Sequence, residues 1–230
     1  MNMIKSIKNL SLLEKVLWLS SLLIILVSFG LIGSDDWLTV IASLIGATAL
    51  IFVGKGDAIG QLLIIIFSII YAIISFQFHY YGEMITYLGM TAPSALIAMI
   101  NWLKNPYTER EVKVNQLTEK IWFILFLSSV GVTYLFYHIL NLCGTSNMFF
   151  STVSITTSFL ASTLTILRSP FYAVAYAAND VVLIILWTLA TIDNMNYLPM
   201  VICFFIFLVN DVYGYINWQL MKRKQAALEE

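Results

Sequence analysis

The chain has 230 residues, of which 60 % are hydrophobic and 11 % are charged, and its formal net charge is −1. This composition excludes an ordinary soluble domain, and the near-neutral charge gives no reason to expect a nucleic-acid partner. The two cysteines, Cys143 and Cys203, belong to no CxxC or His/Cys cluster, so neither a disulfide framework nor a metal site nor another cofactor is expected.

Eight apolar stretches follow one another along the chain, each close to the ~20 residues that a helix needs to cross a bilayer. They run from Val16 to Gly33, Trp37 to Val53, Asp57 to Phe78, Tyr80 to Leu103, Ile121 to Leu142, Met148 to Leu167, Pro170 to Thr191 and Tyr197 to Trp218. No A-x-A-like cleavage site follows the first stretch, so we expect an uncleaved spanning helix there and not a signal peptide. The sequence therefore predicts an all-α integral membrane protein with eight transmembrane helices.

The basic residues are distributed in a way that predicts the orientation. Alternating the eight spans from a cytoplasmic N-terminus places all twelve Lys and Arg residues on the cytoplasmic side. The opposite connections contain Asp35, Asp36, Asp193 and His79 but no Lys or Arg. Because Lys and Arg accumulate in the cytoplasmic loops of membrane proteins, we expect both termini in the cytoplasm and a function exerted within or across the bilayer.

An internal repeat emerges when the chain is shifted against itself by 116 positions. Ile100-Asn101-Trp102 then lies over Ile216-Asn217-Trp218, and Tyr71 lies over Trp187. Chance similarity between apolar helices is the competing explanation, but three spans of equal spacing in each half favour a repeat. A single span between the halves returns the chain to the side of the membrane on which the first half began. The two halves therefore cross the membrane in the same direction, in the 3+1+3 plan of SWEET-type transporters.

The repeat predicts how the chain is divided. The divisions are a cytoplasmic N-terminus with an extra helix (1–36), a first three-helix repeat (37–103), an inner loop with a linker helix (104–146), a second repeat (147–220) and a cytoplasmic tail (221–230). In such a plan the substrate site lies between the two halves, near the middle of the membrane.

Asp180 is the most informative polar residue. It lies about ten positions into the seventh span, ~15 Å along a helix, and therefore near the bilayer centre. Tyr176 and Trp187 share its helical face, and Asn179 precedes it. An acid at this depth indicates a functional site, and a structural hydrogen bond to a neighbouring hydroxyl or amide is the alternative.

Other polar side chains recur at helical spacing. Gln61 and Tyr71 share a face of the third span, and Ser94 and Asn210 occupy equivalent positions of the two halves. We expect these groups to face a shared interior, and interhelical hydrogen bonding is the alternative.

Three further acids have less definite roles. Asp211 is compatible with either a functional or a packing role. Asp57 and Glu83, at the starts of their spans, are expected to be solvated acids that the helix dipole favours.

Five segments resemble the PnuC family of bacterial nicotinamide riboside transporters. They are Gly54-Lys55-Gly56, Tyr81-Gly82-Glu83-Met84, Asn101-Trp102, Asp180-Val181-Val182 and Gly214-Tyr215-Ile216-Asn217-Trp218. The resemblance implies a 3+1+3 core with an extra N-terminal helix, in the bacterial inner membrane. Family members place two tryptophans before the acid of the seventh span, where this chain has Ala173 and Tyr176. A related carrier for thiamine, riboflavin or a deoxynucleoside is therefore the alternative.

The resemblance implies roles for eight side chains. A cationic pyridinium ring would stack on aromatic faces, and amides and hydroxyls would bind its carboxamide and ribose. Asp180 would offset the charge of the ring. The expected substrate-binding residues are Gln61, Tyr71, Ser94, Tyr176, Asn179, Asp180, Trp187 and Asn210.

The expected mechanism is facilitated diffusion. No ATPase motif or diagnostic ion site occurs in the sequence, so uniport by alternating access is predicted, with a cytoplasmic nucleoside kinase trapping the product. The expected partners are a small-molecule substrate and the lipid bilayer. The sequence is also compatible with a homo-oligomer. An intramembrane enzyme or assembly factor is the alternative class, but His79 and His138 both lie near the outer surface, away from any nucleophile or metal cluster.

Overall fold

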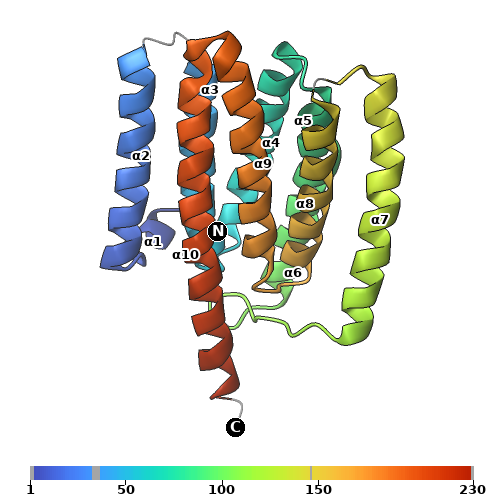
Figure 1. Cartoon of the computed structure of the whole chain (residues 1–230). Helices are drawn as coiled ribbons and strands as arrows, with labels where there is room; N and C mark the ends of the chain where they lie inside the picture. Colours follow the sequence, from blue (N-terminus) through green and yellow to red (C-terminus); the bar gives the residue numbers. More distant parts are fainter. Residues whose placement is uncertain (1–2, 33–36, 146, 229–230) are drawn as a thin grey trace.

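The computed structural model describes residues 3–32, 37–145 and 147–228. The chain forms a bundle of long helices that run along one common direction (Figure 1). In chain order the elements are α1 (Met3–Lys8), α2 (Leu12–Ile32), α3 (Trp37–Gly54), α4 (Ile59–Gln77), α5 (Tyr81–Thr86), η1 (Tyr87–Thr91), α6 (Ala92–Lys104), α7 (Glu119–Leu142), α8 (Met148–Ile166), α9 (Tyr172–Asp193), η2 (Met195–Tyr197) and α10 (Leu198–Ala226).

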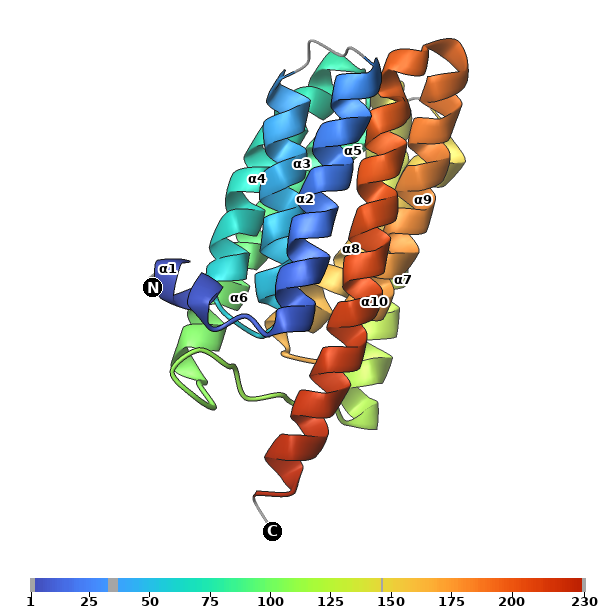
Figure 2. The same cartoon turned by 90° about the vertical axis from the view of Figure 1, so that its left-hand side faces the viewer.

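The predicted spans are confirmed, with shifted ends. Within the described ranges, eight helices are long and apolar enough to cross a membrane. The first begins at Leu12 and not Val16, and the last continues to Ala226, beyond the predicted Trp218. The extra turns of α10 are polar and project from the bundle (Figures 1 and 2). The predicted outer residues Asp35 and Asp36 lie outside the described residues.

The fourth span is interrupted by a π-helical turn. It runs as α5, the π-helical segment η1 and then α6, whose first turn contains Pro93. Proline has no backbone N–H and its ring collides with the carbonyl one turn earlier, so the hydrogen-bond ladder widens at that point. As a result, the side chains of η1 are rotated about the helix axis relative to their positions in a continuous α-helix.

The two ends of the bundle differ in charge. All twelve Lys and Arg residues lie on α1, the first turn of α2, the α3–α4 and α8–α9 turns, the segment 104–120 and the end of α10. We call this the basic end, at the bottom of Figure 1. The α4–α5, α7–α8 and α9–α10 connections lie at the opposite, lysine-free end.

Two peripheral helices flank the packed core. α2 contacts α3 and α10, α7 contacts α8, and the two helices stand on opposite sides of the bundle (Figure 1). Between them, α3, α4, α6, α8, α9 and α10 bury the largest side chains, including Trp102, Trp187 and Trp218. The site therefore has to be sought among the central helices.

The Asn-Trp pairs at the ends of α6 and α10 make reciprocal contacts. Trp102 Nε1 donates to the carbonyl of Thr165 on α8 at 3.0 Å, and Trp218 Nε1 donates to the carbonyl of Val53 on α3 at 2.9 Å. Each carbonyl lies in the last turn of its helix, where it also accepts from a backbone N–H of the following turn, that of Arg168 for Thr165 and that of Gly56 for Val53. The tryptophan of each predicted half thus binds the first helix of the other half.

The neighbouring asparagines repeat this exchange. Asn101 Nδ2 donates to the carbonyl of Ile166 at 2.6 Å, and Asn217 Nδ2 donates to the carbonyl of Gly54 at 2.9 Å. Reciprocal bonds of this kind are what two similar halves related by a two-fold axis would make. They support the predicted repeat.

Candidate functional site

A small chamber lies in the middle of the core, nearer its basic end. Its volume is about 40 Å³, enough for a few water molecules but not for an organic solute. The walls come from α3, α4, η1, α9 and α10, and the lining residues are Gly46, Leu50, Val53, Gln61, Ile64, Phe67, Tyr87, Thr91, Tyr176, Asn179, Asp180, Phe207 and Asp211. We call this space the central chamber.

Two carboxyl groups meet in the central chamber. Asp180 of α9 and Asp211 of α10 are 5 % and 3 % exposed, and both line the central chamber. Oδ2 of Asp180 is buried and has no hydrogen-bond partner. Buried polar atoms are nearly always paired, so this oxygen is a candidate contact for a ligand group.

Two amides complete the polar wall. Oδ1 of Asn179 accepts hydrogen bonds from Thr157 at 2.9 Å and from Ser158 at 3.0 Å, both on α8. These bonds fix the amide and leave its N–H groups as donors. On the facing helix α4, Nε2 of Gln61 is buried without a partner. The central chamber thus presents amide groups from α4 and α9 and carboxyl groups from α9 and α10.

The apolar wall is aromatic. Phe67 packs edge-on against Tyr87 and Phe207, with both ring centroids 5.7 Å away. Gly46 of α3 faces Phe207 so closely that a methyl group at this position would collide with the ring. A glycine is therefore required for the aromatic wall to approach α3.

An aromatic pair closes the central chamber toward the lysine-free end. Nε1 of Trp187 donates to the hydroxyl of Tyr71 at 2.9 Å, and both side chains are essentially fully buried. The ring of Tyr71 lies 4.4 Å from that of Tyr87, which lines the central chamber. The pair therefore forms the next layer along the bundle.

The basic end is closed by the loop between α6 and α7. Val112 N–H donates to the carbonyl of Gly56 at 3.1 Å, and Gln225 of α10 bonds the carbonyl of Val112 at 3.1 Å. Asn115 N–H donates to the carbonyl of Arg168 at 2.9 Å. The loop thus joins the α3–α4 turn, the α8–α9 turn and the end of α10.

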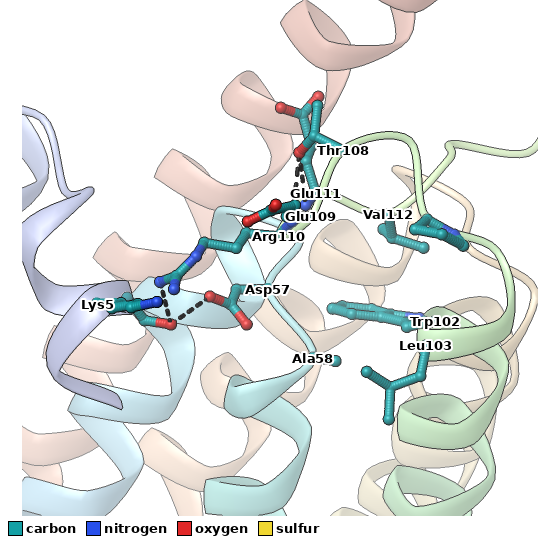
Figure 3. A pocket seen from close by; sticks show the side chains of 13 residues that line it. Lys5, Asp57, Ala58, Trp102, Leu103, Thr108, Glu109, Arg110, Glu111 and Val112 are labelled. Atoms are coloured by element: carbon teal, nitrogen blue, oxygen red, sulfur yellow. Dashed lines mark hydrogen bonds between the residues drawn. The ribbon is translucent and has the colours of Figure 1, made fainter. Parts of the chain in front are cut away.

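A cavity of about 520 Å³ lies under this loop, with Lys5, Asp57 and Arg110 pointing into it from three elements (Figure 3). Asp57 is not the solvated acid that we expected, because it is only 6 % exposed. Its Oδ2 accepts from Ser6 at 2.6 Å, and its Oδ1 accepts from Ile59 N–H at 3.1 Å. Asp57 therefore caps α4 and anchors α1.

Glu83 is also buried, contrary to expectation, with 1 % exposure. Oγ of Ser154 on α8 donates to its Oε1 at 2.7 Å, and its Oε2 has no partner. Glu83 precedes Tyr87 and Thr91 at intervals of four, a spacing that would have indicated an inward-facing stripe. The prediction was wrong because a residue near the end of a span can be enclosed by the neighbouring helices, as Glu83 is.

The structure separates the eight predicted binding residues into three groups. Gln61, Tyr176, Asn179 and Asp180 line the central chamber, and Tyr71 and Trp187 form the adjacent layer. Ser94 is half-buried on α6 and is not part of the lining. Asn210 faces α2 and donates to Ser21 Oγ at 3.1 Å, whereas its neighbour Asp211 faces the central chamber.

The fold and the enclosed polar chamber define a polytopic helical membrane protein with a solute-type site inside its bundle. The model of the family described as nicotinamide mononucleotide transporter matches residues 36–220. The chain therefore belongs to this family, the PnuC transporters.

Named members of the family are similar over nearly the whole chain. The nicotinamide riboside transporter PnuC of Neisseria mucosa is 30 % identical over 216 residues, which are 91 % of this chain and 82 % of that protein. The protein of the same name from Haemophilus influenzae is 26 % identical over 213 residues, 91 % of either chain. The crystal structure of the vitamin B3 transporter PnuC superposes with a TM-score of 0.84 at 30 % identity, covering 94 % of both chains.

Proposed function

We propose that this protein carries nicotinamide riboside across the bacterial inner membrane by facilitated diffusion. The observation that carries the proposal is the central chamber, where unpaired Asp180 Oδ2 and unpaired Gln61 Nε2 are enclosed by aromatic rings. A flat cation with a carboxamide and a ribose needs a carboxylate, amide donors and ring faces. Both named relatives, which are nicotinamide riboside transporters, support the assignment.

The charges of the central chamber favour a riboside over its phosphorylated form. Asp180 and Asp211 both line the central chamber, so two acidic side chains lie beside a bound solute and favour a pyridinium cation over an anion. No Lys or Arg occurs among the lining residues that the structure describes. A phosphate would bring further negative charge beside this pair, which is unfavourable at low dielectric.

The small volume of the central chamber implies that the protein changes shape during transport. At about 40 Å³ the described state is closed around an interior too small for a nucleoside. We infer alternating access, in which the Tyr71–Trp187 pair separates to open the lysine-free end and the α6–α7 loop region separates to open the basic end. The excess of Lys and Arg favours a cytoplasmic location for the basic end.

Facilitated diffusion alone equilibrates a solute and does not concentrate it. Net uptake then requires a cytoplasmic nucleoside kinase, because the phosphorylated product does not fit the charge of the central chamber and is trapped. A kinase of this kind is therefore the functional partner that we propose.

Counterflow into proteoliposomes tests the assignment. Vesicles loaded with unlabelled nicotinamide riboside should take up the labelled compound, and empty liposomes should not. A panel containing the mononucleotide, thiamine, riboflavin and deoxynucleosides as competitors reports selectivity. If thiamine alone competes, thiamine and not nicotinamide riboside is the substrate. Exchange of the mononucleotide would contradict the proposed rejection of phosphorylated substrates.

A further inference from the structure

A second large cavity opens at the lysine-free end of the bundle. Its volume is about 550 Å³, within the range of small-molecule sites. It lies among the α4–α5 connection, the start of α8, the end of α9 and η2. Its polar and aromatic walls include Gln77, Phe78, Tyr80, Asn147, Asp193 and Tyr197. We call it the vestibule.

The vestibule is built on an aromatic layer. The rings of Phe78 and Tyr197 lie 4.8 Å apart, and the indole of Trp187 lies 5.4 Å from both Phe78 and Tyr80. Trp187 is completely buried and holds Tyr71 from the other side. The vestibule and the central chamber are therefore separated by one layer of side chains, the Tyr71–Trp187 pair.

The charge of the vestibule suits a cation. Asp193 supplies a carboxylate, and no Lys or Arg is found among the described residues that line the space. The carboxylate acts on the aromatic layer, because burial and then the negative charges of Asp193 and Glu83 raise the pKa of Tyr80 above its ordinary value. Every Lys and Arg of the protein lies at the other end, and His79 is the titratable base that lines the vestibule beside Asp193.

We propose that the vestibule is a first binding subsite for the same cationic nucleoside. The ring would stack on Tyr197 or Phe78 beside Asp193, while the amides of Gln77 and Asn147 bind its polar groups. This inference rests on the proposed function. The nucleoside then moves to the central chamber when the Tyr71–Trp187 pair separates, so two subsites with the same chemistry, aromatic faces and a carboxylate, follow one another along the path.

The subsite predicts a charge-dependent loss that spares a neutral analogue. Initial uptake into cells, at substrate concentrations well below half-saturation, should fall about threefold to tenfold for Asp193→Asn and for Tyr197→Ala. Reduced dihydronicotinamide riboside has the same ribose and carboxamide without the ring charge. Its uptake should be unchanged by Asp193→Asn. At high ionic strength the difference between wild type and Asp193→Asn should disappear, because the exposed carboxylate is screened.

Matched control variants distinguish a specific loss of binding at the vestibule from a loss of folded protein. Glu119→Gln removes an exposed carboxylate at the basic end and should behave as wild type, whereas Tyr197→Phe keeps the stacking ring and should lose less than Tyr197→Ala. The saturating uptake rate of Asp193→Asn should also stay near that of wild type, which shows intact protein. An unchanged rate in Asp193→Asn, or equal losses for the cation and its neutral analogue, would overturn the subsite. If wild type itself fails to take up nicotinamide riboside, the proposed function has failed instead.

Discussion

Trp187 donates a hydrogen bond of 2.9 Å to the hydroxyl of Tyr71, which precedes it by 116 positions, the offset of the predicted repeat. Trp102 and Trp218 are separated by the same number of positions (218 − 102 = 116), and their rings lie 5.3 Å apart. Equivalent residues of the two halves thus meet at two levels of the bundle. The central chamber lies between these levels, where two similar halves would move apart symmetrically.

The Tyr71–Trp187 bond should contribute measurably to stability. In Tyr71→Phe the indole N–H is left buried without its partner, which typically costs about 1–3 kcal/mol. We expect a lower midpoint of thermal unfolding in detergent. Tyr134→Phe, on the 69 % exposed tyrosine of α7, is the matched control and should leave the midpoint unchanged. Equal midpoints for both variants would mean that the bond does not hold the closed state.

The carboxyl pair should determine the preference for a cation. Asp180→Asn removes the unpaired oxygen, so binding of nicotinamide riboside should weaken by about tenfold, ~1.4 kcal/mol, and that of the neutral dihydro form much less. Asp211→Asn keeps the carboxyl group of Asp180 and its unpaired oxygen, so its effect should be smaller. The double variant should lose the most. Calorimetry with both ligands measures this, and equal losses for both ligands would make the pair structural.

Gly46 should control the volume of the central chamber. A methyl group there collides with Phe207 and comes within 3.2 Å of the ring of Phe67. Gly46→Ala should therefore push the aromatic wall inward, at a cost of about 1–3 kcal/mol, and reduce substrate binding. Gly131→Ala is the control, because no atom lies within 4 Å of the added methyl group. If both variants bind equally, the wall repacks freely.

Asn210 and Asp211, neighbours on α10, show which features of the site the sequence predicted and which it did not. The number and order of spans, and the depth of Asp180, followed from hydropathy and spacing alone. Asn210 was favoured over Asp211 because it matched Ser94 in the repeat, yet it faces α2. That helix lies outside the repeat, so the internal symmetry contained no information about which face of α10 it covers.

The aromatic wall was missed for a different reason. Phe67 and Phe207 look like ordinary apolar residues in a membrane helix, and only their packing around Gly46 identifies them as a wall. Tyr87, on the π-helical turn before Pro93, follows Glu83 by four positions, and this spacing was the signal that could have placed it in the wall. Glu83 was assigned to solvent because of its place near a span end, whereas Ser154 and its neighbours enclose it.

The orientation can be tested with single cysteines. The exposed Cys143 is first replaced by serine, and Cys203, which is buried, is retained. Asn196→Cys at the lysine-free end should then react with an impermeant maleimide in intact cells. Thr108→Cys at the basic end should react only after permeabilisation. Both positions are exposed in the structure, so accessibility differs by side alone. The reverse pattern would invert the proposed topology.

The energetics of transport provide the last prediction. With the membrane potential held at zero, uniport of the cation through the central chamber should stop when the concentrations inside and outside are equal, whatever the proton or sodium gradient. Proton coupling would arise at the Asp180–Asp211 pair, because a cation that displaced a proton from either carboxyl group would couple the two movements. Sealed vesicles free of ATP, with pH or sodium gradients imposed in either direction, distinguish these cases. Accumulation above the equal-concentration level under a pH gradient, abolished in the Asp180→Asn/Asp211→Asn double variant, would replace uniport by proton exchange at this pair. Equal final levels under all gradients would establish that the nucleoside moves alone and that its retention in the cell depends on a subsequent phosphorylation.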